Sequence, residues 1–528
     1  MAQPTPLPPP VAALSDPAVY PHRPSTVDLV QTHISYVFLA GDQVYKVKKA
    51  VRFAFLDFST LERRRHFCHE EVRLNRRLAG DTYRGVVALV PRGDGFALAD
   101  ADAADAVEYA VHMRRLPADR MLPALLARDA VDAALIDRIA ARLVRFHAAA
   151  DAGPEGARGG EPAGIAGLLD DDFAEVAALH GDTISAADDA AIQRWCHAFL
   201  ATHAALLRRR VAAQRIRDGH GDLHAEHICC VEPQPLIFDC IEFSPAFRHR
   251  DVAAEIAFLA MDLTCLGHPQ LAARLVERYA TAAADADLPR LIPFYACHRA
   301  YIRGKIESLT CRAAEVAPEA RAAARQRALD HFALAYRYTW SDAPALVVIG
   351  GLSGTGKSTL AAALAARTGF RHVNSDRTRK QLAGVAPTDR PGDALYTPQR
   401  SAATYAAMYD AAGAALARGE GAILDGTFQR RIDRRAARAV AQRAGVPLLL
   451  VECVASDAEI KRRLAARSAR GDDPSDADWA VYVRQRQRYE PFSSDEGALV
   501  RCSAADTSGI EEALRSLTTT ARRHNDDT

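Results

Sequence analysis

Residues 351–358 read Gly-Leu-Ser-Gly-Thr-Gly-Lys-Ser, and this run constrains the fold of the 528-residue chain more than any other stretch. It follows an apolar, β-type run at 345–349 and precedes an alanine-rich segment that predicts a helix ending at Gly369. A glycine loop between a strand and a helix is the context in which the pattern G-x-x-x-x-G-K-[ST] forms a P-loop. Its backbone N–H groups turn inward around phosphate oxygens, and the helix N-terminus adds a favourable dipole. The sequence therefore predicts a nucleoside triphosphate site in the last third of the chain.

Each residue type in this loop has a chemical role at such a site. Lys357 supplies a positive charge to the β- and γ-phosphates, and the Ser358 hydroxyl is a predicted Mg²⁺ ligand. The residues predicted to bind ATP here are Gly351, Ser353, Gly354, Thr355, Gly356, Lys357, Ser358 and Thr359. The alternative is a glycine-rich turn between a strand and a helix that binds nothing.

Composition excludes several other classes of protein. Basic and acidic residues balance at 67 to 66, so no overall field draws the chain to nucleic acid or to an anionic membrane. The ten cysteines form no CxxC pair, which is typical of reduced thiols. The proline-rich start has no signal-peptide pattern, and no apolar run approaches the roughly 18 residues that span a bilayer. We therefore expect a cytoplasmic protein without a membrane partner, and the sequence leaves its oligomeric state open.

The order of the expected elements divides the chain into three parts. Residues 1–24 are proline-rich and are expected to form a flexible lead. In 25–340, short β-type runs precede long alanine-rich helices, which predicts a small lobe at about 25–115 and a helical lobe at about 116–340. From 341 to 528 strands alternate with helices, which predicts a doubly wound parallel sheet with flanking helices. The expected fold class is thus a multidomain chain with an α+β part and an α/β part.

A second group of polar residues lies at 220–227, which reads His-Gly-Asp-Leu-His-Ala-Glu-His, and Asp239 follows an apolar pair shortly after it. This stretch resembles the aminoglycoside phosphotransferase family, whose members are relatives of protein kinases. The resemblance implies a bilobal kinase-like fold, with Asp222 as the catalytic base that accepts a proton from the substrate hydroxyl. It also implies that Asp239 binds the metal at the position of the kinase D-F-G aspartate. Asp251, with Glu255 one turn further on, is expected to brace the fold.

The same resemblance implies a lysine on a strand of the small lobe and a glutamate on the next helix. Lys46 and Lys48 share one face of the β-type run 44–48, because side chains alternate along a strand, and we favour Lys46 as the lysine that binds ATP. Glu71 lies in an apolar helical stripe, where a carboxylate needs a cationic partner. Lys46 and Glu71 are therefore the expected nucleotide-binding pair. The alternative for Glu71 is a surface side chain that extends into water.

Two positions depart from the pattern of this family. His227 stands where the family has an asparagine that holds a second Mg²⁺, and imidazole nitrogen is a poor ligand for a hard cation. Either one metal is bound differently, with Glu242 as a further candidate ligand, or this half is catalytically impaired. No glycine-rich loop covers the phosphates, and Ser35 in the corresponding turn is a candidate phosphate donor. A zinc cluster of His220, His224 and His227 is a further alternative.

Two strand ends in the C-terminal part carry acidic residues. Residues 373–380 run from a strand through Asp376 and Arg379 into a helix, and the apolar run 422–425 ends in Asp425. The part from about 345 to 520 resembles P-loop kinases of small molecules and polynucleotides, a group within the AAA-type ATPases that includes gluconate kinases and zeta-toxin-like kinases. The resemblance implies that Asp376 orients or deprotonates the acceptor hydroxyl and that Arg379 holds the acceptor. It also implies that Asp425, at the Walker-B position, binds Mg²⁺ through water. The alternative for both aspartates is a structural cap at the end of a strand.

A helix after the next strand carries Arg463, Arg467 and Arg470 along one face, and a polar loop at 471–478 follows it. By the same resemblance this region is a lid, whose arginines Arg463 and Arg467 neutralise charge on the transferring phosphoryl group. Three candidates share the face, so the sequence does not single out one lid arginine. The alternative is a solvated helix face, which is the usual place of such residues.

The whole chain resembles bacterial fusions of two kinase-like domains. The expected function is transfer of a phosphoryl group from ATP, with Mg²⁺, to a hydroxyl of a small-molecule or nucleotide-like acceptor. Two alternatives stay open at this point. The N-terminal half could be a nucleotide-sensing pseudokinase that regulates an active C-terminal kinase, as His227 suggests. The chain could also be a regulatory ATPase without a small-molecule acceptor.

Overall fold

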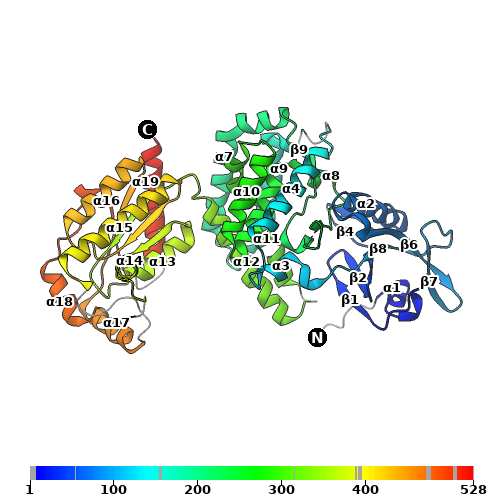
Figure 1. Cartoon of the computed structure of the whole chain (residues 1–528), viewed down its shortest axis with the longest axis horizontal. Coiled ribbons are helices and arrows are strands. Elements are labelled where there is room, and N and C mark those ends of the chain that lie inside the picture. The colour runs from blue at the N-terminus through cyan, green and yellow to red at the C-terminus, as the bar shows by residue number, and fades with distance from the viewer. Residues whose placement is uncertain are drawn as a thin grey trace. The chain divides into compact units, whose positions relative to one another are not determined.

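The computed structural model describes residues 7–53, 55–153, 157, 159–313, 316–386, 389, 395–470, 477–503 and 508–526, without the side chains of 468–470, 508 and 522–526. The chain forms two compact units, Met1–Ala335 and Tyr336–Thr528, each with its own hydrophobic core (Figure 1). Among the described helices, none has both the length and the apolar character needed to cross a membrane.

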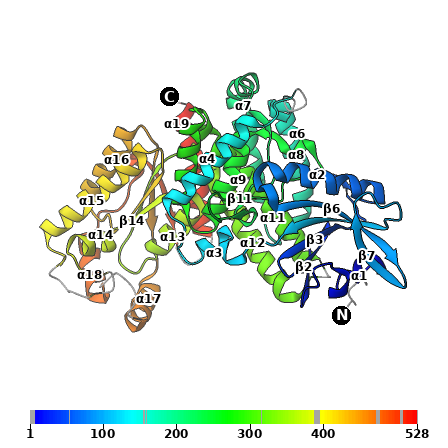
Figure 2. The same ribbon diagram turned by 45° about the vertical axis from the view of Figure 1, so that its right-hand side comes forward.

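The N-terminal unit begins with an antiparallel sheet of six strands in the order β1-β2-β3-β8-β6-β7. The strands are β1 (Val27–Gln31), β2 (Ser35–Ala40), β3 (Gln43–Lys48), β6 (Tyr83–Arg92), β7 (Gly95–Asp100) and β8 (Glu108–Arg114). Helix α2 (Leu61–Ala79) packs on β6 and β8, and Figure 2 shows it lying along the sheet. The Thr60 hydroxyl caps this helix by accepting a hydrogen bond from the Arg63 N–H at 3.3 Å. A ribbon of β4 (Arg52–Phe53) and β5 (Leu56–Asp57) precedes α2.

The described part of the N-terminal lead is packed against this sheet, which corrects the expectation of a flexible segment at 1–24. Residues Pro9–Ala13 form α1 and Pro17–Val19 form a short 3-10 helix. Val11, Leu14 and Tyr20 are buried among apolar residues of β2, β3, β6 and β8. Proline is well tolerated in the first turn of a helix, so the proline content did not prevent helix formation. Residues 1–6 lie outside the described part of the chain.

The rest of the N-terminal unit is a helical lobe (Figure 1). Its helices are α3 (Leu122–Leu126), α4 (Ala133–Ala149), α6 (Pro162–Val176), α7 (Ala186–Ala212), α8 (Pro245–Arg248), α9 (Val252–Cys265), α10 (Pro269–Ala282), α11 (Leu288–Arg312) and α12 (Pro318–Tyr338). Two small ribbons lie beside them, β9 (Ile216–Asp218) with β12 (His249–Asp251) and β10 (Ile228–Cys229) with β11 (Leu236–Ile237). Short 3-10 turns occur at Gly80–Thr82, Ala118–Arg120, Ala177–Leu179 and Ala225–His227. Because α9 is buried on nearly all sides, it forms the centre of this lobe.

The C-terminal unit is built on a parallel sheet of five strands in the order β14-β15-β13-β16-β17. The strands are β13 (Leu346–Gly350), β14 (Arg371–Asn374), β15 (Ala422–Asp425), β16 (Leu448–Cys453) and β17 (Ala498–Cys502). All five residues of β13 are buried, as expected for a central strand that is covered on both faces. The parallel sheet of this unit, and the antiparallel sheet and helical lobe of the other, confirm the predicted fold class of an α/β part and an α+β part.

Helices cover both faces of the parallel sheet. Helices α13 (Lys357–Thr368) and α19 (Ser508–Asp526) contact each other as well as the sheet, and α15 (Pro398–Ala417) and α16 (Arg431–Ala444) form a second contacting pair. The remaining helices are α14 (Ser375–Leu382), α17 (Asp457–Arg470) and α18 (Trp479–Gln487), and a 3-10 turn lies at Ser494–Glu496. In a parallel sheet, the loops after the strands meet at one edge, and the predicted site residues of this unit follow β13, β14, β15 and β16.

Candidate functional site

The loop after β13 turns at glycines before it enters α13. Gly351 has a φ of 143° and Gly356 a φ of 93°, which are backbone conformations that favour glycine. A Cβ atom on Gly351 would also lie 2.5 Å from the carbonyl oxygen of Cys453, so the close approach of β16 excludes a side chain there. Lys357 is the first residue of α13, and its Nζ lies 3.4 Å from the Leu352 carbonyl oxygen of the same loop. The lysine ammonium is thereby turned toward the loop.

The Ser358 hydroxyl and the Asp425 carboxylate lie together beside this loop. Ser358 Oγ donates to Asp425 Oδ1 at 3.2 Å, and Asn374 Nδ2 donates to Asp425 Oδ2 at 2.6 Å. Burial raises the pKa of the Asp425 carboxyl, but the hydrogen bond from His372 and the charge of Lys357 outweigh burial and lower the pKa. The carboxylate is therefore ionised at neutral pH. Two oxygen donors of this kind fit Mg²⁺, which prefers oxygen ligands and often keeps its water.

Asp376 and Arg379 form an ion pair at the start of α14, where β14 ends. Arg379 donates to Asp376 Oδ1 at 2.7 Å, and its guanidinium lies 4.6 Å from the centre of the Tyr396 ring. Asn374 caps the helix by accepting hydrogen bonds from the N–H groups of Asp376 and Arg377. Since β14 is the neighbour of β15, this pair lies on the same sheet edge as Asp425.

The two candidate lid arginines have different surroundings. Arg463 of α17 donates to the carbonyl oxygen of Thr355 in the glycine loop at 3.1 Å and to Glu459 at 2.6 Å. Arg467 donates instead to the carbonyl oxygen of Ala477. The Arg470 side chain and most of the predicted lid loop, residues 471–476, lie outside the described part of the chain. Of the arginines described here, Arg463 is the one in contact with the glycine loop.

Gln485 of α18 is a contact of this loop that the sequence did not indicate. Its Oε1 accepts a hydrogen bond from the Ser353 N–H at 3.0 Å, so it occupies one of the backbone donors that a phosphate would otherwise use. A single glutamine on a helix has no pattern that predicts such a contact.

In the N-terminal unit, two lysines of β3 converge on one glutamate of α2. Lys46 Nζ lies 2.9 Å from Glu71 Oε1, and Lys48 Nζ lies 2.7 Å from Glu71 Oε2. Lys46 also contacts Asp239 Oδ1 at 2.5 Å, and Lys48 contacts Glu242. Because Glu71 is fully buried, it is not the surface side chain of the alternative interpretation. Lys46 is the lysine that joins α2 to Asp239, while Lys48 joins it to Glu242.

Electrostatic interactions keep both Lys46 and Asp239 ionised. Burial disfavours the ammonium of Lys46, but the charges of Asp239 and Glu71 outweigh burial and hold the pKa of Lys46 well above its usual value. Burial likewise raises the pKa of the Asp239 carboxyl, but the charge of Lys46, with a smaller contribution from His227, outweighs burial and holds the pKa well below its usual range. Burial raises the pKa of Glu242.

The loop 220–227 places Asp222 among histidines. His224 Nε2 lies 3.6 Å from Asp222 Oδ2, and His227 Nδ1 lies 3.7 Å from the same oxygen. Burial raises the pKa of the Asp222 carboxyl, but the close approach and charge of His224, with smaller contributions from His227 and Arg303, lower it well below its usual range. His220 is turned away, since its Nε2 bonds to the Phe238 carbonyl oxygen at 2.8 Å. The three histidines of the zinc alternative therefore do not come together, whereas Asp222, His224 and His227 do.

Ser35 is the first residue of β2 and is fully buried. Its hydroxyl has no hydrogen-bond partner among the described residues. The turn 32–34 that precedes it is held instead by Thr32, whose hydroxyl accepts a bond from the Ser35 N–H at 3.0 Å. The predicted role of Ser35 as a phosphate donor stays a prediction.

Glu255 of α9 positions the loop that carries Asp222. Its Oε1 accepts hydrogen bonds from the backbone N–H groups of His220 and Gly221, both at 2.5 Å, and its Oε2 lies 2.7 Å from His147 Nε2. The nearby Asp251 has a different task, because it caps α9 and pairs with the buried Arg210. Both acids are thus structural contacts of this lobe, and Glu255 acts directly on the loop.

We expect Glu255→Gln to lower the stability of the N-terminal unit most at neutral pH. Burial raises the pKa of Glu255, but the hydrogen bond and charge of His147 outweigh it and lower the pKa to about 2 from an ordinary 4.5. A carboxyl whose pKa is lower in the folded state than in the unfolded state stabilises the fold at a pH above the unfolded pKa. This stabilisation, about 3 kcal/mol in all, is lost as the pH falls toward 2. Denaturant unfolding at several pH values measures the effect. A difference between wild type and variant that does not shrink between pH 4.5 and 2 would contradict it.

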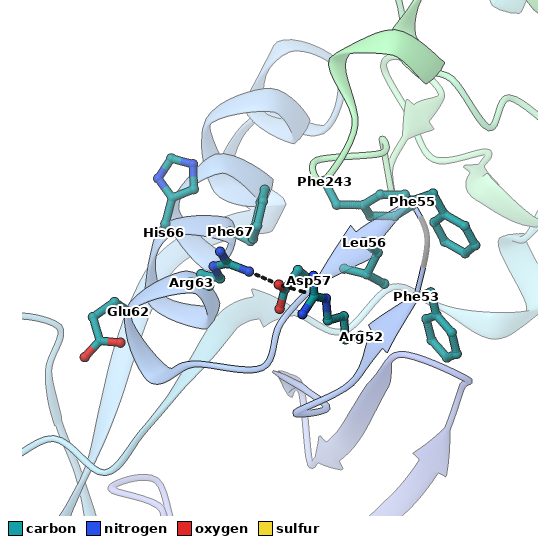
Figure 3. Close-up of a pocket in the computed structure, with 10 residues that line it drawn as sticks. All are labelled: Arg52, Phe53, Phe55, Leu56, Asp57, Glu62, Arg63, His66, Phe67 and Phe243. Carbon is teal, nitrogen blue, oxygen red and sulfur yellow. Dashed lines mark hydrogen bonds and ion pairs between the residues drawn. The ribbon is translucent and has the colours of Figure 1, made fainter.

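A hollow of about 670 Å³ lies between the β4–β5 ribbon, the first turns of α2 and Phe243 (Figure 3). Phe53 and Phe55 are 44% and 51% exposed at its rim. Figure 3 shows Arg63 reaching Asp57, with which it forms an ion pair. Because this guanidinium and carboxylate are already paired with each other, aromatic rings form much of the rest of the lining of the hollow.

Comparisons with known proteins found a family match within the C-terminal unit, relatives over most of the chain, and solved structures similar to parts of it. Residues 346–492 match a family described as AAA domain. Two relatives, the uncharacterized proteins Rv2004c of Mycobacterium tuberculosis and Mb2027c of Mycobacterium bovis, are 32% identical over 467 residues, which cover 87% of this chain and 90% of each relative. A gluconokinase from Sinorhizobium meliloti is 19% identical over 35% of this chain and 98% of its own, with a TM-score of 0.27. A choline kinase from Cryptosporidium parvum is 9% identical over 61% and 94%, with a TM-score of 0.36.

The matched domain and the loop geometry define the class of the C-terminal unit, which is a P-loop domain of the AAA type. The similarity to the mycobacterial proteins extends over most of the chain and of the relatives. The chain therefore belongs to the same protein family as these two mycobacterial proteins.

Proposed function

We propose that this protein is an ATP- and metal-dependent phosphotransferase that acts on a hydroxyl group of a small-molecule or nucleotide-like acceptor. One observation carries the proposal. At a single edge of the parallel sheet, Ser358 and Asp425 lie 3.2 Å apart beside the glycine loop, and the Asp376–Arg379 pair stands at the end of the adjacent strand. An enzyme that only hydrolyses ATP orients a water molecule and has no second substrate to hold. A kinase uses such a pair to hold and orient a second substrate.

In the C-terminal unit the proposed roles follow from position. Lys357 and the N–H groups of the glycine loop hold the phosphates of ATP, and Asp376 orients the acceptor hydroxyl and takes its proton. Arg379 holds the acceptor, and Arg463 neutralises charge on the transferring group. Mg²⁺ bound with ATP at Ser358 and Asp425 would offset the charge that develops on the phosphate oxygens.

In the N-terminal unit, Lys46 is the proposed phosphate ligand, held in place by Glu71 on α2. Asp222 is the proposed base, and its low pKa keeps it ionised over the whole neutral range, so that it can orient the acceptor hydroxyl as a hydrogen-bond acceptor. Ionised Asp239 provides oxygen donors for a metal ion, with one carboxylate oxygen held by Lys46. These groups support a second phosphotransferase site in the same chain.

A second candidate function for the N-terminal unit is supported by His227. Its ring lies 3.6 Å from Asp239 Oδ2, where the resemblance to kinases implies an asparagine. If that imidazole prevents productive metal binding, the unit senses nucleotide and regulates the C-terminal kinase without catalysing transfer.

The test is transfer of labelled γ-phosphate from ATP into a cell-metabolite extract by wild type, Lys357→Ala and Asp222→Ala. We expect each substitution to remove a different labelled product, because each unit then acts on its own acceptor. If Lys357→Ala removes every product and Asp222→Ala alters only the rate, the N-terminal unit is a sensor. Labelled inorganic phosphate as the sole product of wild type would refute the phosphotransferase proposal.

A further inference from the structure

His227 has one ring nitrogen committed to the backbone and one directed at a carboxylate. Its Nδ1 lies 2.9 Å from the carbonyl oxygen of Asp222, and because a carbonyl only accepts, Nδ1 carries the hydrogen. In a neutral ring, Nε2 then has a free lone pair. That atom lies 3.6 Å from Asp239 Oδ2. Histidine ligands of metals show this arrangement, in which a bond from one nitrogen fixes the ring and leaves the other to the ion.

The two oxygens of the Asp239 carboxylate also have different neighbours. Oδ1 contacts the Lys46 ammonium at 2.5 Å, and that lysine is held in turn by the buried Glu71. Oδ2 is left facing His227. Two ligand atoms that are each about 2.1 Å from one ion lie about 3.0 to 3.4 Å apart. The 3.6 Å between His227 Nε2 and Asp239 Oδ2 therefore exceeds the distance in a metal site by only a few tenths of an ångström.

We propose that His227 Nε2 and Asp239 Oδ2 are ligands of one divalent transition-metal ion, of which Mn²⁺ is representative, and that this ion accompanies the nucleotide in the N-terminal unit in preference to Mg²⁺. The inference rests on the proposed function, because it assumes that this unit binds ATP. Imidazole nitrogen is a good ligand for first-row transition ions, whereas Mg²⁺ prefers oxygen throughout its shell. Mn²⁺ also accepts the oxygen ligands that Asp239 and phosphates provide.

The neighbouring group of Asp222, His224 and His227 is a less suitable place for the ion. Their ligand atoms lie within 4.8 Å of one another. However, the His227 nitrogen near Asp222 Oδ2 is Nδ1, which already donates to the Asp222 carbonyl and has no lone pair to offer. An ion there would also occupy the proposed base. The geometry therefore points to the Asp239 side of the His227 ring.

The same chain contains an internal contrast. In the C-terminal unit, the proposed metal ligands Ser358 and Asp425 offer oxygen, and the nearby His372 Nε2, 3.1 Å from Asp425 Oδ2, is a hydrogen-bond partner of that carboxylate. The two units are therefore expected to differ in metal preference, with Mg²⁺ serving the P-loop unit and a transition ion serving the other.

The experiment uses the full-length chain with Lys357→Ala, which removes ATP binding at the P-loop, and titrates ATP in the presence of Mn²⁺ or of Mg²⁺. We expect the Mn²⁺ complex to bind tighter by about tenfold or more, within the range that metal-site contacts contribute. Pulsed electron paramagnetic resonance on protein labelled with ¹⁵N-histidine supplies a direct readout. A ¹⁵N coupling to bound Mn²⁺ is expected, and it distinguishes a histidine ligand from the nitrogens of adenine.

His227→Asn, added to this background, replaces the imidazole with an amide oxygen and should remove both the coupling and the preference for Mn²⁺. The matched control is His331→Asn in the same lobe. The His331 Nδ1 also bonds a backbone carbonyl, that of Arg327 at 2.8 Å, and its Nε2 has no partner among the described residues. Asp262 and Glu307 act on the His331 ring through their charge, but no described carboxylate forms an ion pair with it, so this control should change neither readout.

Four results would overturn the inference. Equal affinity of the Lys357→Ala chain with intact His227 for ATP in the presence of Mn²⁺ and of Mg²⁺ would exclude ligation by the imidazole. Absence of the ¹⁵N coupling would exclude it as well, and the phosphotransferase proposal would stand in both cases. A coupling that persists in His227→Asn would assign it to another histidine. Failure to bind ATP with either metal, in a variant that melts like wild type, would overturn both this inference and a nucleotide site in the N-terminal unit.

Discussion

Asp376→Asn is expected to lower phosphoryl transfer by the C-terminal unit about 10²- to 10⁴-fold, the usual contribution of a positioned acid or base. The amide has nearly the same shape as the carboxylate but does not accept a proton, and it weakens the ion pair with Arg379. The affinity for ATP should change little, because Asp376 lies in the first turn of α14 and not in the glycine loop. Acceptor-dependent formation of labelled product, measured beside equilibrium binding of ATP, separates the two effects.

The matched control is Asp433→Asn on α16 of the same unit. Asp433 pairs with Arg430 three residues before it at 2.8 Å, as Asp376 pairs with Arg379 three residues after it at 2.7 Å. Both aspartates lie in the first turn of a helix, but of the two only Asp376 adjoins the strand end beside Asp425. Equal losses in the two variants would mean that the effect is structural. Unchanged ATP turnover in Asp376→Asn, with no dependence on added metabolites, would favour an ATPase without an acceptor.

Glu71→Ala is expected to destabilise the N-terminal unit by about 3 to 5 kcal/mol, the usual cost of leaving buried charge unpaired. The carboxylate is fully buried between two lysines, of which Lys48 is 1% exposed and Lys46 is 13% exposed. Its removal leaves two neighbouring ammonium groups whose remaining ion-pair partners, among the described residues, are Asp239 and Glu242. Amide hydrogen exchange in β3 and α2 reports the stability of this unit without interference from the other.

Glu70→Ala, one position earlier on the same helix, is the control. Glu70 pairs with Arg73 at 2.7 Å on the outer face, where the arginine side chain is 58% exposed, and such pairs contribute about 0 to 1 kcal/mol. Similar exchange rates in the two variants would contradict a special role for the buried network. In Glu71→Ala we also expect weaker binding of ATP by the N-terminal unit, because Lys46 loses the contact that holds it to α2.

Local patterns allowed the main elements to be predicted because their causes are local. The apolar run before Gly351 and the alanine-rich segment after it predicted β13 and α13, which the structure has at Leu346–Gly350 and Lys357–Thr368. The alternation of strands and helices after 341 predicted the parallel sheet. Composition misled at the N-terminus, because the burial of Val11, Leu14 and Tyr20 depends on a sheet formed by residues later in the chain.

At the candidate sites, too, local patterns predicted some features and others depended on the folded chain. Spacing alone indicated that Lys46 and Lys48 share a face and that Glu71 needs a cation. It did not indicate that one glutamate serves both lysines, or that Glu242 is the second partner of Lys48. The contact of Gln485 with Ser353 was likewise unpredictable, since it joins residues 132 positions apart and a lone amide has no sequence pattern.

By itself, the sequence determined the phosphate loop, the fold class of each half and the residue types at the candidate sites. These features depend on backbone freedom at glycines and on periodic burial, which are properties of residues close together in the sequence. Only the tertiary structure decided which charges meet. A buried carboxylate acquires its pKa and its partner from elements distant in the chain, as Asp239 does between Lys46 and His227. The direction of the His227 ring, set by one hydrogen bond to the Asp222 carbonyl, is likewise a property of the folded chain.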